Sequence, residues 1–267
     1  MSNSLITAVF SPHDEISRSL LAIHLGRPDS LLIDLGLPFG GLDTLLNVFP
    51  EKSWADLVPV AHDMSSDLLS RAVTPIERHG GLLAAPALAA TSEGLTPAVI
   101  GALLARARER YDRIVLDVSP ALREAQLTAL TLADRIALVV RADIPGLVIG
   151  QRCLAWLHGL GLRDRVRIVT TATVPPAPVS AHEIAQALGP VFASLPWDPA
   201  VTARARNLGE PWRSTVSPIG QALAETARRW EQDWTSIPLS EPRVSRWRQT
   251  GDLIRSLFAR TTLARPT

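Results

Sequence analysis

The sequence of 267 residues is poor in cysteine, in lysine and in long apolar runs. Its only cysteine, Cys153, cannot form a disulfide within the chain, which is consistent with a reducing cytoplasm. No apolar run approaches the ~20 residues of a membrane-spanning helix, and Met1 to Phe10 lack the basic start of a signal peptide. We therefore expect a cytoplasmic protein.

Lys52 is the only lysine, so 26 of the 27 basic residues are arginine, a bias that a GC-rich genome would explain. The formal net charge is +1, so no global field draws the chain onto nucleic acid. The six histidines are scattered, and we find no metal-ligand spacing, catalytic triad or Cys–His pair in the sequence. We therefore expect neither a bound metal nor a nucleic-acid partner.

Short apolar runs alternate with helical patterns along the chain. Within the runs apolar residues do not alternate with polar ones, which is typical of strands buried on both faces of a parallel sheet. The order predicts an α/β fold, with a doubly wound, mostly parallel sheet flanked by helices. The predicted strands are Leu5–Phe10, Leu31–Asp34, Leu82–Ala85, Arg113–Asp117, Arg135–Val140, Arg167–Thr170 and Val191–Leu195. The predicted helices include Ser17–Leu25, Thr96–Arg110 and Ile219–Trp234.

The domain organisation follows from composition. Residues 1–234 form the predicted α/β domain. Thr235 to Pro242 contain two prolines and small polar residues, which is typical of a linker. Residues 243–267 form a separate basic tail.

The segment after the first predicted strand, Ser11 to Leu20, lies where such a fold places its ligand-binding loop. A phosphate-binding loop would need glycines for close backbone approach, and a Lys and a Ser or Thr for phosphate and magnesium. The sequence reads Ser-Pro-His-Asp-Glu-Ile-Ser-Arg-Ser-Leu instead. The place is right for a phosphate loop, but most of the residue types are not.

This segment resembles the deviant Walker A motif of the MinD/ParA ATPases in its lead-in, Val9 to Pro12, and in the helix Leu20–Leu25 that follows. Compared with that motif, His13 stands at the signature lysine, Arg18 at the phosphate lysine and Ser19 at the hydroxyl residue. Asp14, Glu15 and Ser17 stand at glycines. The degenerate loop therefore comprises Pro12, His13, Asp14, Glu15, Ile16, Ser17, Arg18 and Ser19.

These departures predict weak nucleotide binding at most. Carboxylates at Asp14 and Glu15 would repel a triphosphate by on the order of 1 to 4 kcal/mol for each close pair of charges. Side chains at former glycines also obstruct the backbone cradle. Arg18 could still pair with a phosphate, so ATP with Mg²⁺ stays possible but weak. The alternative is a plain strand–helix turn, with Asp14 or Ser17 as the N-cap.

The resemblance extends over about residues 5 to 234. Leu31 to Leu46 is similar to the second signature of the family in its CpaE/TadZ pilus-assembly branch, with Asp34 kept and Gly36 at the second aspartate. Asp117 stands at the Walker B position, where a carboxylate would hold the water shell of Mg²⁺. For Asp34 and Asp117 the alternative is that each caps a strand end or a neighbouring helix.

The resemblance also places Thr171, Pro196 and Asp198 in the loops on the base side of a nucleotide. The asparagine that reads the base in active relatives is absent, and Thr170 or Thr171 stands there instead. Several nucleotide contacts of the family are thus degraded together.

The tail has six arginines and one acidic residue, Asp252. Written as a helix, it has an apolar side with Trp247, Ile254, Leu257 and Phe258, and a basic side with Arg248 and Arg255. A basic amphipathic helix with aromatic residues suits an anionic membrane surface. The alternative is a helix that packs on its own domain or on a partner.

The resemblance implies two functions. One is a pseudo-ATPase that serves as a dimeric localisation or scaffold protein for a type IV (Tad/Flp) pilus machine, possible partners being its secretion ATPase or assembly proteins and the inner membrane. The other is an active MinD/ParA-like ATPase in division-site selection or in chromosome or plasmid partitioning.

Deletion of residues 243–267 tests the tail. Because those residues carry the basic and aromatic side chains, we expect the truncated protein to lose sedimentation with anionic liposomes, while the full chain sediments. Equal sedimentation of the two proteins would contradict a membrane role of the tail.

Overall fold

The computed structural model describes residues 4–13, 16–77, 79–121, 123–172, 179–211 and 217–235. Contacts divide the chain into two units, Met1–Trp230 and Glu231–Thr267, and the fold below is that of the first. The tail residues named above lie outside the described residues, so the linker and tail boundaries stay predictions. In the described part of the chain, no helix combines the length and the apolar character that crossing a membrane requires.

One eight-stranded sheet organises this unit, in the order β3-β4-β2-β5-β1-β6-β7-β8. All neighbouring strands pair in parallel except β3 and β4, which are antiparallel. The strands are β1 (Leu5–Phe10), β2 (Ser30–Leu35), β3 (Thr74–Ile76), β4 (His79–Leu83), β5 (Arg113–Val118), β6 (Arg135–Arg141), β7 (Val166–Thr171) and β8 (Val191–Leu195). The predicted doubly wound α/β fold is therefore confirmed.

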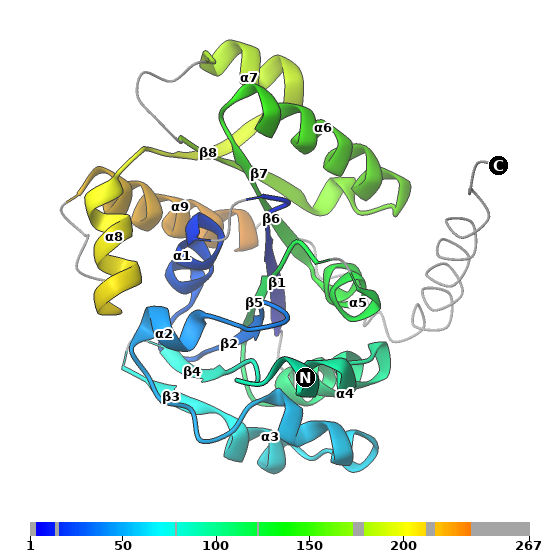
Figure 1. The fold of residues 1–267 in the computed structure, drawn as a ribbon. Helices are drawn as coiled ribbons and strands as arrows, with labels where there is room; N and C mark the ends of the chain where they lie inside the picture. The colour runs from blue at the N-terminus through cyan, green and yellow to red at the C-terminus, as the bar shows by residue number, and fades with distance from the viewer. Residues whose placement is uncertain are drawn as a thin grey trace. The chain divides into compact units, whose positions relative to one another are not determined.

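Helices cover both faces of the sheet. Figure 1 shows α1, α8 and α9 on one side and α4, α5 and α6 on the other. The α-helices are α1 (Ile16–Leu25), α2 (Leu42–Leu46), α3 (Ser66–Ala72), α4 (Pro97–Ala107), α5 (Glu124–Leu132), α6 (Ile144–Gly159), α7 (Ala181–Leu188), α8 (Pro199–Leu208) and α9 (Pro218–Thr235). The 3-10 helices are η1 (Trp54–Asp63), η2 (Ala89–Gly94) and η3 (Arg163–Arg165).

The two faces of the sheet are chemically different. Alternate residues of the strands, such as Ile33 and Leu116, pack into one large apolar core with α4 to α7. Their neighbours Asp34 and Asp117 point to the opposite face, where α1 lies, because successive side chains of a strand alternate. The strands thus carry a fully apolar face and a face with polar residues near their carboxyl ends.

The last helix packs against the first strand. Trp230 of α9 is buried, and its Nε1 donates a hydrogen bond to Thr7 Oγ1 of β1 at 3.1 Å. Its ring also packs edge-on against Phe192 of β8. Residues 223 positions apart in the sequence are therefore joined across this face of the sheet.

One predicted strand is placed wrongly. The sequence predicts Leu82–Ala85, but β4 runs from His79 to Leu83 and so includes Gly80 and Gly81, although glycine carries no strand signal. Gly81 pairs with Leu31 of β2. A Cβ on Gly80 would lie 2.7 Å from the Ser30 carbonyl oxygen, so only glycine fits there. The short edge strand β3, which contains Pro75, gives no sequence signal either.

Candidate functional site

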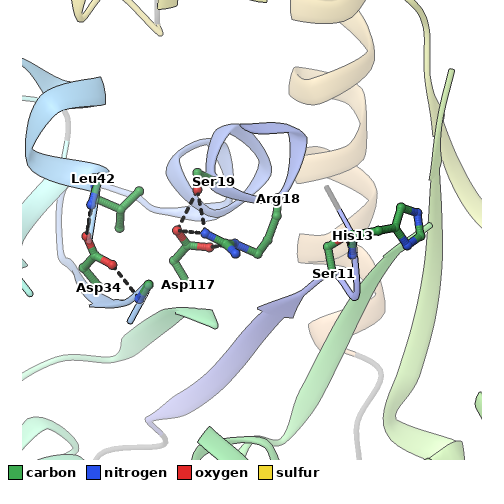
Figure 2. Close-up of polar contacts among 9 residues, drawn as sticks. Ser11, His13, Arg18, Ser19, Asp34, Leu42 and Asp117 are labelled. Carbon is green, nitrogen blue, oxygen red and sulfur yellow. Dashed lines mark hydrogen bonds and ion pairs between the residues drawn. The ribbon is translucent and has the colours of Figure 1, made fainter. Parts of the chain in front are cut away.

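The candidate site lies at the carboxyl ends of the central parallel strands, where α1 begins. Asp34 on β2 and Asp117 on β5 are direct register partners, so two buried carboxyl groups stand next to one another on adjacent strands. Helix α1 brings Arg18 and Ser19 over the second of them (Figure 2). The polar core of the site is thus made by two strands and one helix.

Arg18 forms a two-pronged ion pair with Asp117. Its Nε lies 2.5 Å from Asp117 Oδ1, and its Nη2 lies 3.2 Å from Asp117 Oδ2. Ser19 Oγ donates to the same Oδ2 at 2.7 Å. The side chains of Arg18 and Asp117 are 6% and 2% exposed, so the pair is shielded from water. Both oxygens of the Walker-B-like carboxylate are therefore held by residues of α1.

Asp34 organises the loop that follows its own strand. Oδ1 accepts a hydrogen bond from the Gly36 N–H at 2.8 Å, and Oδ2 accepts from the N–H groups of Gly41 and Leu42, both at 2.9 Å. It therefore caps the start of α2, where Gly41 provides no side chain. Trp54 adds to the fixation by donating Nε1 to the Asp34 carbonyl oxygen at 3.0 Å.

Burial, and after it the negative charge of Asp117, raise the pKa of Asp34 to about 6. The three N–H donors lower this pKa but do not cancel the effect of burial. Asp34 is thus a buried carboxyl group that titrates close to neutral pH.

Ser17 and Thr171 connect the start of α1 to the end of β7, their hydroxyl oxygens lying 3.2 Å apart. Ser17 lies within α1, so it is not the N-cap that one interpretation of the sequence considered. Its hydroxyl faces a neighbouring strand because α1 packs closely on the sheet. The other candidate cap, Asp14, and with it Glu15, lie outside the described residues.

His13 turns away from the Arg18–Asp117 pair (Figure 2). Its Nε2 accepts a hydrogen bond from the Arg141 backbone N–H at 2.7 Å, at the end of β6. Since a backbone N–H can only donate, Nε2 carries no proton in this arrangement. The side chain at the signature-lysine position is therefore tied to its own chain.

The remaining predicted residues lie farther along the same edge. Pro196 and Asp198 follow β8, the edge strand of the sheet. Asp198 is the N-cap of α8, since its Oδ1 accepts from the Val201 N–H at 3.1 Å. These two residues are not bonded to the Arg18–Asp117 pair.

Asp143, which the sequence analysis did not identify, also belongs to this edge. It caps α6 through a 2.7 Å hydrogen bond from the Gly146 N–H and pairs with Arg141 at 2.9 Å. Desolvation would raise its pKa, but the hydrogen bonds from Gly146 and Arg141 and the charge of Arg141 lower it below its ordinary value. An aspartate two residues before a proline is a helix-start signal that could have revealed it.

Solved structures with the same architecture include ATPases of the ParA and MinD types. A ParA family ATPase from Chlorobium tepidum TLS has a TM-score of 0.76 and 19% identity, covering 85% of this chain and 99% of that chain. MinD from Pyrococcus horikoshii OT3, complexed with Mg-ADP, has a TM-score of 0.74 and 17% identity, covering 86% and 97%. The MinC:MinD cell division protein complex of Aquifex aeolicus has a TM-score of 0.69 and 19% identity, covering 89% of this chain and 99% of that chain.

The chain has the fold of the MinD and ParA ATPases. No protein-family model matches the sequence, and no curated protein sequence matches it either. At 16 to 19% identity the likeness concerns the fold.

Within the MinD/ParA fold, the described residues do not fit a Mg²⁺ ion beside Asp117. Such an ion would have to displace the Arg18 guanidinium or share the carboxylate with it, and two buried cations repel one another. No group of three His, Cys, Asp or Glu side chains in the described ranges is placed to hold a metal ion. Both carboxylate oxygens of Asp117 are bonded to Arg18 and Ser19 instead.

The titration of Asp34 gives a prediction with a defined sign. Its pKa is raised on folding, so its contribution to stability is present in acid and is lost as the pH rises through about 6. We expect the wild type to gain about 1 kcal/mol in free energy of unfolding relative to Asp34→Asn between pH 8 and pH 5. Urea unfolding at both pH values measures this, and parallel pH profiles would contradict it.

Gly36 gives a second prediction. A Cβ at this position would lie 2.8 Å from Asp34 Oδ1, so Gly36→Ala should disturb the Asp34 cap and cost on the order of 1 kcal/mol. A Cβ on Gly159 in α6 would meet nothing within 4 Å, so Gly159→Ala is the matched control. Thermal unfolding should show a loss for the first variant alone, and equal stability of the two would refute the steric argument.

Proposed function

We propose that this chain is a catalytically degenerate MinD/ParA-like protein that works as a localisation or scaffold factor for a type IV (Tad/Flp) pilus machine, like the CpaE/TadZ branch. The observation that carries the degenerate part is the buried ion pair of Arg18 with Asp117. Arg18, at the phosphate-lysine position, is ion-paired with Asp117, the Walker-B-like carboxylate. Neither side chain is then available to a nucleotide without first breaking a buried ion pair.

Breaking that pair is costly. Separation of a buried, hydrogen-bonded ion pair leaves a desolvated charge and typically costs about 3 to 5 kcal/mol. A nucleotide would have to recover this energy at a loop whose glycine positions are filled by side chains, including Ser17 bonded to Thr171. We therefore propose little or no nucleotide binding and no ATP turnover of functional significance.

The carboxyl edge of the sheet also supports a role in binding a partner. Large apolar side chains are exposed just after four strands of this edge. They are Phe39 at 73% after β2, Leu88 at 69% after β4, Ile144 at 62% after β6 and Trp197 at 45% after β8. Exposed apolar residues gathered on one edge are typical of a protein interface. We propose that a second copy of the chain docks there without nucleotide.

The pilus assignment rests on the sequence resemblance to the CpaE/TadZ branch at Leu31 to Leu46. The alternative is an active MinD/ParA-like ATPase in division-site selection or partitioning, as the MinD named in the MinC:MinD structure is a cell division protein. The genes next to this one decide between the two: pilus-assembly genes favour the scaffold, and division or partitioning genes favour the alternative. If the protein is a scaffold, we propose that its tail binds the surface of the inner membrane.

A nucleotide experiment tests the degenerate site. The wild type should release no phosphate above background with Mg-ATP, and a fluorescent ATP analogue should bind with a Kd no tighter than millimolar, because Arg18 is already paired. Asp117→Ala is the control, since an active site would lose turnover in it. Phosphate release by the wild type that disappears in Asp117→Ala would establish the enzyme instead.

The dimer is tested by light scattering without nucleotide. We expect a dimer for the wild type and a shift towards monomer for a variant with Phe39→Ser and Ile144→Ser, because both changes remove apolar area from the carboxyl edge. Leu68→Ser on α3, a side chain 37% exposed elsewhere on the surface, is the matched control. A monomeric wild type, or equal dimers in all three proteins, would contradict the proposed interface.

A further inference from the structure

The Asp34–Asp117 pair is a concentrated negative charge inside the protein. The two residues are direct partners in the β2–β5 register, and they are 1% and 2% exposed. Their electrostatic interaction contributes to the raised pKa of Asp34. Two neighbouring carboxyl groups out of contact with water require a counter-charge or a proton.

Arg18 supplies that counter-charge from α1. In the ranges that the structure describes, it is the only basic side chain hydrogen-bonded to either carboxyl group, through Nε and Nη2 on Asp117. Asp34 receives backbone N–H groups instead. Arg18 is thus bonded to only one of the two acidic groups, which agrees with the raised pKa of the other, Asp34.

The guanidinium group is also fixed in its place. Helix α1 is packed on the sheet, Arg18 is 5% exposed, and its Nη2 donates to the neighbouring Ser19 Oγ at 3.2 Å. A covalently attached cation cannot dissociate, unlike a metal ion that is in equilibrium with solvent. The planar guanidinium matches the carboxylate with two N–H groups, which an ammonium group could not do.

We infer that Arg18 is the built-in counter-ion of the Asp34–Asp117 pair and takes the place of a dissociable divalent cation at this edge of the fold. This inference rests on the proposed function, in which the site needs no nucleotide. The first helix, β2 and β5 then reach their final arrangement when the chain folds. The face that they build is set permanently and is not switched by a ligand.

A thermodynamic cycle between Arg18 and Asp34 tests the charge balance. Arg18→Met should lower the Tm by about 10 °C, because it leaves two buried carboxyl groups without a counter-ion. Asp34→Asn added to Arg18→Met should raise the Tm of that variant by several degrees. The same change in the wild type should not raise the Tm. Arg18→Lys keeps the charge and should lie between the wild type and Arg18→Met. Additive effects in the cycle, as expected if Arg18 only fills space, would overturn the inference.

The change in Tm on addition of Mg²⁺ is a second test, because a loss of packing at Arg18 would not by itself make the protein respond to Mg²⁺. Addition of 10 mM MgCl₂, compared with NaCl of the same ionic strength, should raise the Tm of Arg18→Met but not that of Arg18→Met/Asp117→Asn or of the wild type. The matched control is Arg108→Met, which removes the partly exposed ion pair with Asp134 and should show no response to Mg²⁺. A wild type stabilised by Mg²⁺ as much as Arg18→Met would overturn the inference.

The two proposals fail separately. Stabilisation of the wild type by Mg-ATP, but not by MgCl₂ alone, would contradict the proposed nucleotide-independent function and leave the cycle between Arg18 and Asp34 as it is. Additivity in the cycle would contradict the counter-ion role while ATP binding stays undetectable. If Arg18→Met does not fold, the cycle is carried out with Arg18→Gln, which is also uncharged, and Asp34→Asn should reduce the loss of Tm that Arg18→Gln causes.

Discussion

The ion pair between Arg18 and Asp117 is the contact around which the functional face is arranged. It joins α1 to the middle of the sheet, and the oxygen shared with Ser19 ties two successive residues of α1 to one carboxylate. The sequence resemblance led us to expect these three side chains, one basic, one hydroxyl and one acidic, at a nucleotide and its magnesium ion. Here the three side chains bond to one another, and their contacts hold α1 on the sheet.

Asp34 has a different structural role on the neighbouring strand. Its carboxyl group caps α2 and shapes the loop after β2, and its backbone oxygen accepts from the buried indole of Trp54. Gly36 is required by this arrangement, because a Cβ there would lie 2.8 Å from Asp34 Oδ1. The cap formed by Asp34 therefore depends on a glycine two residues further along the chain.

The sequence was sufficient for the fold because its signals are local and strongly apolar. The ends of β1 and β8 were predicted to the residue, since both are short, mostly apolar segments followed by a polar or turn residue, Ser11 and Pro196. β4 was misplaced because Gly80 and Gly81 fit only through their close approach to Ser30 and Thr74, a tertiary requirement that composition does not reveal. Of the site, the sequence placed Arg18, Ser19 and Asp117 in one loop system. It could not indicate that they bond to each other, nor that His13 reaches Arg141, because both contacts join segments about 100 or more residues apart.

The hydrogen bond from Trp230 to Thr7 has a consequence for the order of folding during synthesis. β1 lies between β5 and β6, so the first strand to leave the ribosome has no neighbour in the sheet until residues beyond 113 have been made. The hydroxyl of Thr7 on β1 receives its hydrogen bond only when the helix that carries Trp230 emerges. Contacts of such long sequence separation make folding slow. The nascent amino-terminal strand therefore has no partner in the sheet until more than 113 of the 267 residues have been made, which is a period in which a chaperone could bind it.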